Sequence, residues 1–479
     1  MTGWNTMKSS IFRIVCFLTI LILVLSAINR VFKFKYDDGI YSLTKFYEQD
    51  KDSVDLLILG SSHAFSAFNT GVLWEKEGIA AYDLCGSMQP LWNTYYYFKE
   101  ALKTQKPGLV VLEAYMVTHD DDYIFYGSTI KNTFGMRLSP DKIRAVTVSV
   151  PKETELEYLM EYTQYHNRYK EISEADFDKE AGNAMYRDWK GFMANLYVEP
   201  FGDPEIVTEY EAASIHGKSE TYYRKILELA KDNDIPVLVV LTPYAGVTSQ
   251  DMMKYERAEE IASEYGASFI NYNKLYREIG IDYKNDVSDE GHLNYLGSEK
   301  FTNAFADYLK DNYELPDRRN SSGYGSWENN AGYTDAKLKE MKLMNAERLE
   351  DYTALLNEDD CIIISCPERA KEHRDLFEMF GITPADDAEE GIWYRDMSGD
   401  DVLYITGEDK SEFEMYGHEV RLSREYRYDT DRLANRVFIG RDEYNNRSGG
   451  MNITVYNKIT DTVISDIGVD TDAGNKLIR

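Results

Sequence analysis

The sequence predicts an α/β protein with a doubly wound, flavodoxin-like parallel sheet, and two observations lead to this fold class. Between residues 51 and 314, short apolar runs alternate with longer helical patterns. Such alternation is typical of parallel strands whose two faces are covered by crossover helices. The apolar run 54–59 also leads into Gly60-Ser61-Ser62, and the run 237–241 leads into Thr242-Pro243, as expected where strands run into loops at one edge of a sheet. We therefore expect one α/β domain over residues 51–314.

The elements of this domain follow in order along the chain. The expected strands are 54–59, 79–84, 109–112, 237–241 and 267–271, and the expected helices are 91–103, 219–231, 250–265 and 295–308. Residues 116–215 interrupt the alternation with a polar, Tyr-rich stretch that we interpret as a helical insertion. It follows a strand's carboxyl end, so it either covers the crevice as a lid or substrate wall or packs as a plain helical elaboration.

The N-terminus carries a long apolar segment. Residues 11–28 contain only Arg13, Thr19 and Ser26 as polar side chains, and about 17 to 25 such residues span a bilayer. We predict a cytoplasmic tail at 1–10, an uncleaved signal anchor at 11–32 and a linker at 33–50. A cleavable signal peptide is the alternative. Basic residues flank both ends of the segment, so the positive-inside rule leaves the orientation open. The short tail favours a single-pass protein whose catalytic domain is extracellular.

A second domain follows a change in composition. Residues 315–334 are rich in Pro, Arg, Asn, Ser and Gly, which is typical of a linker. Residues 335–479 combine a helix over 335–356, a strand over 361–365, a helix ending near Gly381 and several alternating strands. The strands are expected at 402–406, 419–422, 436–439, 452–456 and 462–467. This pattern predicts an accessory α+β domain with an antiparallel sheet.

Charge and metal-ligating residues exclude several classes of function. The net charge of -30, from 53 basic and 83 acidic residues, would repel phosphate backbones, so nucleic acid is not an expected partner. The 7 histidines and 4 cysteines form no cluster with metal-ligand spacing, and no cofactor is expected. Cys361 and Cys366 flank an expected strand and should point to opposite faces, too badly placed to pair.

Two distant motifs carry the candidate chemistry. Ser62 lies in Gly60-Ser61-Ser62-His63, directly after the first strand, and Asp289 and His292 lie in Asp289-Glu290-Gly291-His292 before the last helix. A serine hydroxyl needs an imidazole to accept its proton and a carboxylate to orient that imidazole. The Asp-x-x-His spacing lets the last two meet within one short segment. Either motif alone is more often structural, but their order in one α/β pattern predicts a Ser62, His292, Asp289 triad.

These motifs resemble the SGNH (GDSL-type) hydrolase superfamily over roughly residues 50–312. The resemblance is to its envelope-associated branch, which includes the D-alanyl transfer protein of teichoic acids and alginate acetyltransferase-like proteins. It implies that Ser62 is the nucleophile, that Asp289 and His292 are acid and base, and that the N–H groups of Ser62 and Gly86 form the oxyanion hole. Gly86 stands in Leu84-Cys85-Gly86-Ser87.

The chain departs from the family pattern at two positions. The strand 109–112 runs into Glu113-Ala114-Tyr115, where the family has an Asn, so the third oxyanion donor is open and Gln89 is the substitute candidate. Ser61 replaces the commoner Asp beside the nucleophile, which leaves Ser61 itself as a weaker alternative to Ser62.

The C-terminal run Gly449 to Asn457, with Val463-Ile464 and Val469-Asp470-Thr471, resembles the interleukin-like epithelial transition inducer domain. One relative of that domain is a sugar-binding glycosyltransferase stem domain, so the resemblance implies a glycan-binding accessory module. A domain that only packs or dimerises is the alternative.

Together these observations predict a membrane-anchored serine esterase or acyltransferase acting on O-acyl groups of envelope polysaccharide. The resembling proteins imply a membrane protein as acyl donor. A non-catalytic glycan-binding scaffold with a degenerate site and a lipase acting on neighbouring lipid are the other classes left open.

Overall fold

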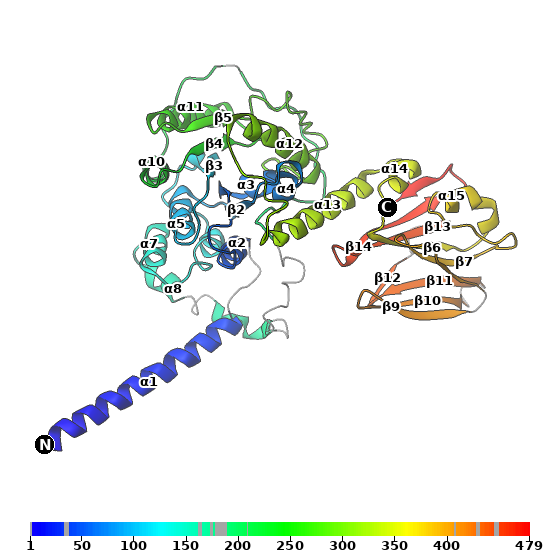
Figure 1. The fold of residues 1–479 in the computed structure, drawn as a ribbon, viewed down its shortest axis with the longest axis horizontal. Coiled ribbons are helices and arrows are strands. Elements are labelled where there is room, and N and C mark those ends of the chain that lie inside the picture. Colours follow the sequence, from blue (N-terminus) through cyan, green and yellow to red (C-terminus); the bar gives the residue numbers. More distant parts are fainter. Residues whose placement is uncertain are drawn as a thin grey trace. The chain divides into compact units, whose positions relative to one another are not determined.

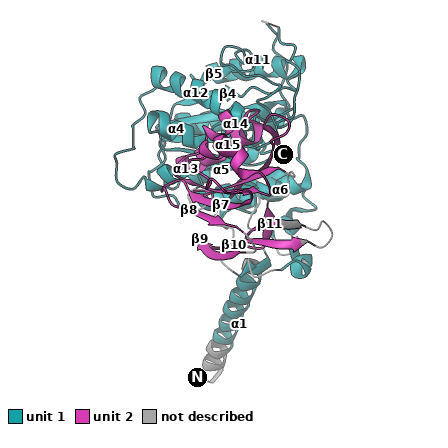
Figure 2. Cartoon of the chain, turned by 90° about the vertical axis from the view of Figure 1, so that its right-hand side faces the viewer, with its two compact units in different colours: residues 1–330 teal, residues 331–479 magenta. Residues whose placement is uncertain are grey.

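The computed structural model describes most of the chain (Figure 1). The described residues are 2–32, 38–160, 165–172, 176–177, 189–207, 209–406, 409–427, 432–444 and 450–479. They divide into two compact units, residues 1–330 and 331–479, which Figure 2 colours separately. Residues 33–37 of the predicted linker and Gly449 of the C-terminal motif lie outside the described residues.

The first unit is built on a five-stranded parallel sheet. Its strands have the order β2-β1-β3-β4-β5. Their bounds are β1 (Leu56–Gly60), β2 (Ala81–Cys85), β3 (Leu109–Glu113), β4 (Val237–Leu241) and β5 (Ser268–Asn271). The four strands β1 to β4 are buried over their whole length. In β1, β3 and β4 this fits their runs of Val, Leu and Ile, whereas β2 also buries Tyr82 and Asp83. This order confirms the predicted fold class, and it places the topological switch point between β1 and β3.

Helices cover both faces of this sheet (Figure 1). They are α3 (Ser62–Ala67), α4 (Thr70–Glu77), α5 (Leu91–Ala101), α10 (Gly217–Asp232), α11 (Ser249–Glu264) and α12 (Tyr295–Asn312). On one face, Phe301 and Phe305 of α12 join Ile58 of β1 in a buried cluster. Each fully buried aromatic side chain contributes about 1.5–3 kcal/mol relative to an exposed one. On the other face, α5 contacts β1 and packs against α10.

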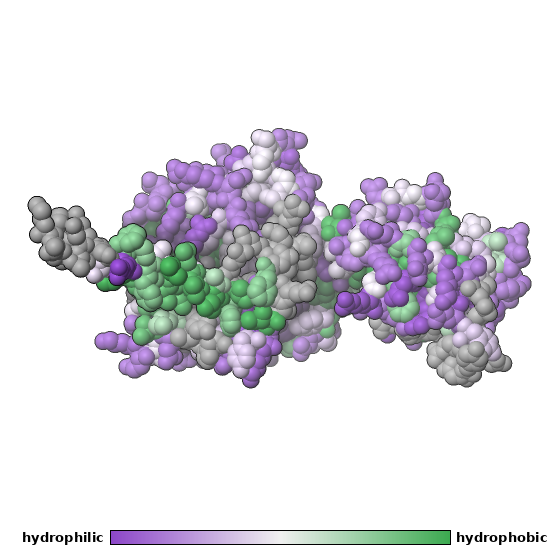
Figure 3. All heavy atoms as spheres, turned by 90° about the horizontal axis from the view of Figure 1, so that it is seen from below, coloured by the Kyte–Doolittle hydropathy of each residue, from purple (hydrophilic) through white to green (hydrophobic). Residues whose placement is uncertain are grey.

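The N-terminal helix α1 (Thr2–Phe32) carries the apolar segment. Ser10–Ile28 has a mean hydropathy of 2.8 and is long enough to cross a membrane. Its large apolar side chains are exposed, and Figure 3 shows them along the left of the view. After the gap at 33–37, α2 (Asp38–Phe46) occupies part of the predicted linker. Ile40, Leu43 and Phe46 of α2 are buried, so this segment is packed into the first unit because it has an apolar face.

The named helices of the insertion lie before residue 171. It contains η1 (Tyr115–Thr118), α6 (Tyr126–Lys131), α7 (Pro140–Ser149), α8 (Glu155–Leu159) and η2 (His166–Lys170). Among the described residues 189–207 and 209–216 there is no helix, which corrects the prediction of a helical stretch to residue 215. The backbone there bonds to the segment before α12 instead: Glu199 N–H donates to Val287 O at 3.0 Å and Phe201 N–H to Tyr283 O at 2.8 Å.

The second unit contains two antiparallel sheets, with the orders β15-β14-β13-β6-β7-β8 and β12-β11-β10-β9. The first has β6 (Asp360–Cys366), β7 (Gly391–Asp396), β8 (Val402–Ile405), β13 (Met451–Asn457), β14 (Thr462–Asp470) and β15 (Lys476–Ile478). The second has β9 (Lys410–Met415), β10 (His418–Arg427), β11 (Arg432–Ile439) and β12 (Asp442–Tyr444). The short helices described in this unit are α14 (Leu349–Thr353), η5 (Ala370–His373) and α15 (Arg374–Glu378). As predicted, Cys361 and Cys366 pack into different clusters on opposite faces of β6.

The helix that joins the two units was misplaced by the sequence. The predicted helix 335–356 is two helices: α13 (Gly325–Asn345), which begins ten residues earlier, inside the expected linker, and the short α14, which follows after a break at 346–348. Trp327 explains the difference, because its ring is buried in the first unit and its Nε1 donates to Ala81 O at 2.9 Å. This long-range contact orders a stretch whose composition indicates a linker.

Candidate active site

The nucleophile candidate stands where β1 turns into α3. Gly60 ends the strand, Ser61 is the N-cap, and Ser62 is the first residue of the helix. The amide N–H groups of a helix's first turn have no partner within the helix. Ser62 therefore presents both a hydroxyl and a backbone N–H at the carboxyl edge of the sheet, at its switch point.

The acid and base candidates lie on the segment between β5 and α12. Asn294 caps α12 by accepting from Gly297 N–H at 3.1 Å. Just before this cap, Ser288 N–H donates to His292 O at 3.0 Å, so residues 288–292 form a tight turn. This turn brings the side chains of Asp289 and His292 to the same side, as the three-residue spacing predicts.

The structure brings the three predicted side chains together. His292 Nε2 lies 2.7 Å from Ser62 Oγ, and His292 Nδ1 lies 2.8 Å from Asp289 Oδ1 and 3.0 Å from Oδ2. Gly291 N–H also donates to Asp289 Oδ1 at 2.8 Å, which fixes the carboxylate. With a proton on Nδ1 shared with Asp289, Nε2 is the acceptor for the Ser62 hydroxyl. The side chains of His292 and Asp289 are 28% and 39% exposed, so a substrate can reach them.

The structure distinguishes the two adjacent serines. Ser61 is buried, and its Oγ donates to Glu113 Oε2 at 3.2 Å while accepting from His63 N–H at 3.4 Å. Ser62 is partly exposed, and its Oγ faces His292. Only Ser62 therefore combines access with a base, which favours it over Ser61.

Gly86 lies on a loop that side chains from two helices hold in place. Asp38 accepts from Ser87 N–H at 2.9 Å and from its hydroxyl at 2.6 Å, and Lys131 Nζ lies 2.9 Å from the same carboxylate. Burial opposes ionisation of Asp38, but the bonds from Ser87 and the Lys131 charge hold its pKa below the usual value. A Cβ on Gly86 would lie 2.4 Å from Asn132 Oδ1, so the loop has no room for a larger residue.

Gln89, the substitute candidate for the third oxyanion donor, is fully buried behind this loop. Its Nε2 donates to Thr94 Oγ1 at 3.1 Å, and its Oε1 lies 3.3 Å from the place of a Cβ on Gly86. The side chain thus supports the Gly86 loop from inside. Its assignment as an oxyanion donor stays a prediction.

A group of three rings beside the triad was missed by the sequence reasoning. The ring of His63 stacks on that of Tyr115, with centroids 3.6 Å apart, and meets the edge of the Tyr244 ring at 4.9 Å. The His63 and His292 ring centroids are 5.1 Å apart. Burial, and then the nearby His292, lower the pKa of His63 well below its usual value, so this ring is neutral. His63 follows Ser62 in sequence, and this was the only signal that could have pointed to it.

Glu113 occupies the position where an Asn was expected. It ends β3 next to Gly60, is 1% exposed, and accepts from both Ser61 Oγ and Tyr115 N–H. Burial raises its pKa to about 7, against the opposing effect of these hydrogen bonds.

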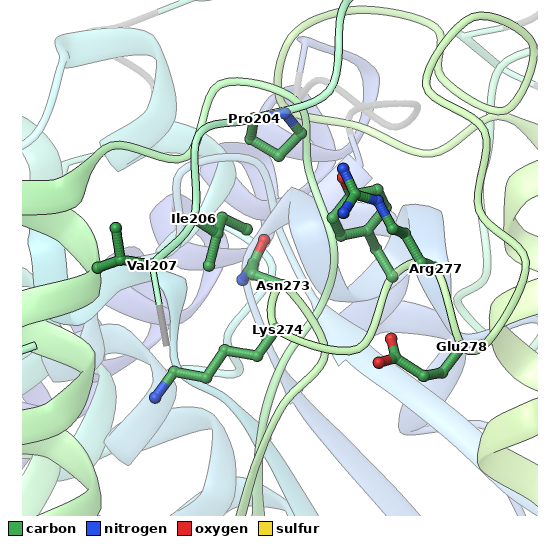
Figure 4. A pocket seen from close by; sticks show the side chains of 8 residues that line it. Pro204, Ile206, Val207, Asn273, Lys274, Arg277 and Glu278 are labelled. Carbon is green, nitrogen blue, oxygen red and sulfur yellow. The ribbon is translucent and has the colours of Figure 1, made fainter. Parts of the chain in front are cut away.

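A cavity of about 250 Å³ opens near the carboxyl end of β5 (Figure 4). Pro204, Ile206 and Val207 line one side, and Asn273, Lys274, Tyr276, Arg277 and Glu278 line the rest. Asn273 Oδ1 accepts from Tyr244 N–H at 3.2 Å, which links the cavity wall to the three rings. In the described part of the chain, no group of three or more His, Cys, Asp or Glu side chains could hold a metal ion.

No protein-family model and no curated protein matches this chain. Similar solved structures include a protein described as lipolytic and of the G-D-S-L family from Desulfitobacterium hafniense, 13% identical, covering 53% of this chain and 98% of its own, with a TM-score of 0.27. Another is a gut microbial enzyme that metabolises diltiazem, 8% identical, with coverage of 54% and 48% and a TM-score of 0.28.

A third is a proposed acylhydrolase from Bacteroides fragilis, 13% identical, with coverage of 62% and 96% and a TM-score of 0.22. Two of these three neighbours are described as a G-D-S-L-family protein and an acylhydrolase, but the TM-scores are too low to carry an argument. The fold is assigned from the strand order of the parallel sheet. The candidate site is assigned from the distances between Ser62, His292 and Asp289.

Proposed function

We propose that this protein is a membrane-anchored, extracytoplasmic serine esterase or acyltransferase that removes or adds O-acyl groups on an envelope polysaccharide. The observation that carries the proposal is the continuous chain of contacts from Ser62 Oγ through the His292 ring to Asp289. Such a chain is the arrangement that activates a serine hydroxyl for acyl transfer. Its place at the switch point of a parallel sheet, open to solvent, supports the same conclusion.

The geometry supports a two-step mechanism. Ser62 Oγ attacks the acyl carbonyl while its proton passes to His292 Nε2, and Asp289 stabilises the resulting imidazolium. The N–H groups of Ser62 and Gly86 are the proposed donors to the oxyanion, each worth about 2.7–4 kcal/mol in the transition state. The alkoxide then leaves with the proton from His292, and an acyl-Ser62 ester remains. Water as the second nucleophile releases an acid, whereas a sugar hydroxyl forms a new ester.

Labelling of the full-length protein in detergent micelles with a fluorophosphonate probe tests the catalytic assignment. The wild type should react and hydrolyse p-nitrophenyl acetate, and Ser62→Ala should abolish both. Ser263→Ala, which removes an exposed hydroxyl on α11, is the matched control and should behave as wild type. Labelling and turnover that persist unchanged in Ser62→Ala contradict the proposal, and a folded wild type that never reacts favours the non-catalytic scaffold.

Acetylated and deacetylated polysaccharides, supplied to the active protein, then decide the direction of transfer. Release of acetate from the first indicates an esterase. Transfer to the second, from an acyl donor held by a membrane protein, indicates a transferase. Hydrolysis of phospholipid in preference to both substrates would instead support the lipase alternative.

The N-terminal helix supports the membrane part of the proposal, because Ser10–Ile28 is long and apolar enough to span a bilayer. We propose that residues 1–10 lie in the cytoplasm and that the chain after residue 32 lies outside. Protease added to intact cells should then digest both units and leave a small N-terminal fragment. Full protection of the chain until the cells are broken would contradict this orientation.

The second unit supports a proposal of glycan binding. It holds a cavity of about 460 Å³ whose polar lining includes Arg369, His373, Asp470 and Asp472. Arg369 Nη2 pairs with Asp472 at 3.0 Å, so the cavity presents both donors and acceptors for sugar hydroxyls. Binding of envelope glycans by the full chain, lost in Arg369→Ala but kept in Ser62→Ala, is the expected result. Equal binding in Arg369→Ala would contradict a role of this cavity.

A further inference from the structure

Glu113 connects the two segments that flank the nucleophile. Its Oε2 accepts from Ser61 Oγ at 3.2 Å, and its Oε1 accepts from Tyr115 N–H at 2.7 Å. The side chain is 1% exposed, so these two groups replace the water that would otherwise solvate it. Only a carboxylate accepts with both of its terminal atoms, because the amide of a Gln accepts with one and donates with the other.

Through Ser61, the carboxylate acts on the start of α3. With its hydroxyl proton directed to Glu113, the Ser61 oxygen is left to accept from His63 N–H as the N-cap. An N-cap fixes the direction in which the first helical residue leaves the strand. That residue is Ser62, whose Oγ lies 2.7 Å from His292 Nε2.

Through Tyr115, the same carboxylate acts on the base side of the site. The Tyr115 ring stacks on His63 at 3.6 Å between centroids, and the His63 ring in turn lies 5.1 Å from that of His292. The Glu113 carboxylate therefore bonds to the residues on both sides of the nucleophile's surroundings. It accepts from Ser61, which precedes Ser62, and from Tyr115, whose ring stacks on His63.

Gly60, at the end of the neighbouring strand β1, leaves room for the Glu113 side chain. A Cβ on Gly60 would lie 2.7 Å from the Cβ of Glu113 and 3.1 Å from its Oε2. A side chain there would push the carboxylate away from Ser61. The glycine of the Gly-Ser-Ser motif is thus needed so that a long acidic side chain from β3 can reach beneath the nucleophile turn.

From these contacts we propose that Glu113 is a positioning residue, which sets the Ser62 turn and the His63–Tyr115 stack for reaction in place of the missing Asn. This inference rests on the proposed function, because it assigns a role within the same site. Glu113 does not touch the reacting atoms, and it acts on them through Ser61 and Tyr115.

The experiment compares the rate of fluorophosphonate labelling in the full-length wild type, Glu113→Gln and Glu113→Ala. We expect a decrease of about 10- to 100-fold, because small displacements of a nucleophile cost rates of this order. Glu100→Gln is the matched control: Glu100 is also a buried acid, bonded to Tyr47 and Lys103, but it lies on α5. This control should label at the wild-type rate.

The pH profile separates positioning from general stability. The groups that face Glu113 are Cys85 of β2, Tyr115, Tyr244 after β4 and Tyr255 of α11, all with raised pKa values and uncharged near pH 7. As the pH falls through about 7, protonation of Glu113 should lower the labelling rate of the wild type, because the protonated carboxyl no longer accepts with both of its oxygens. Glu113→Gln lacks this carboxyl, so its labelling rate should fall less steeply than that of the wild type when the pH is lowered from about 8 to about 6.

A double-mutant cycle with Ser61→Ala completes the test. If Glu113 acts through Ser61, the rate losses of the two single variants should not add in the double variant. Wild-type labelling rates in both Glu113→Gln and Glu113→Ala, or a pH slope unchanged in Glu113→Gln, would overturn the proposal. If the proposed function itself is wrong, the wild type does not react with the probe. This result is distinct from one in which the wild type and the Glu113 variants react at equal rates.

Discussion

The two halves of the candidate site are held by different kinds of contact. Asp289 and His292 are three residues apart, and their mutual bond and the turn around them are local. The Ser62 turn instead depends on β3, because its neighbour Ser61 bonds to Glu113, 52 residues away. A local pair keeps its geometry wherever its turn forms, whereas the nucleophile is placed only when β1 and β3 pair correctly. Substitutions at Asp289 or His292 should therefore reduce activity by removing a group that takes part in the reaction. Substitutions around Ser62 should reduce activity by moving the nucleophile out of position.

We expect the largest loss of activity from a substitution in the acid–base half, the pair Asp289 and His292. Asp289→Asn should lower kcat by about 10³- to 10⁴-fold with little change in fold, because an amide at this place no longer fixes the His292 tautomer. Turnover of p-nitrophenyl acetate measures the loss. Asp311→Asn, which changes an exposed carboxylate on α12, is the control. A loss of less than tenfold in Asp289→Asn would show that the pair does not work as a unit.

We expect a smaller loss of activity from a substitution in the loop that holds Gly86. Gly86→Ala should reduce kcat about 100-fold, because its Cβ would displace Asn132 or shift the amide N–H that is the proposed oxyanion donor. Gly202→Ala is the matched control, since a Cβ there meets no atom within 4 Å. An unchanged KM with a reduced kcat would place the effect in the transition state. Wild-type turnover in Gly86→Ala would remove this glycine from the mechanism.

The buried carboxylate predicts the smallest effect, and it concerns stability. Burial raises the pKa of Glu113 to about 7 from its usual value near 4.5. Between these values the folded chain holds a proton that the unfolded chain releases. The stability contribution of Glu113 therefore falls as pH rises through this window, by roughly 3 kcal/mol in total.

Urea unfolding of the first unit at pH 5 and pH 8 measures this linkage. Glu113→Gln should remove the decrease, so at pH 8 the variant should be as stable as the wild type or more stable, although it reacts more slowly. Glu100→Gln again serves as the control. If Glu113→Gln is less stable than the wild type at pH 8, the buried, ionised carboxylate does not destabilise the fold. The nucleophile half would then not differ from the acid–base half in this respect.

Particular elements show how far the sequence could be read. The limits of β4 and the start of α12 were predicted to the residue, because a continuous apolar run and an Asn cap are local signals. Four strands of the second unit were missed, namely β7, β9, β12 and β15. β9, for example, reads Lys-Ser-Glu-Phe-Glu-Met, and its strand conformation comes from pairing with β10 rather than from its own composition.

Sequence alone determined the strand and helix alternation, the apolar N-terminal segment and the Asp-x-x-His spacing, since each depends on residues that are neighbours along the chain. Only the tertiary structure decided which of two adjacent serines faces the histidine and what takes the place of the absent Asn. The physical reason is that burial and hydrogen-bond partners at the β1 and β3 ends are set by strand pairing, and no local pattern records which side chains that pairing brings together.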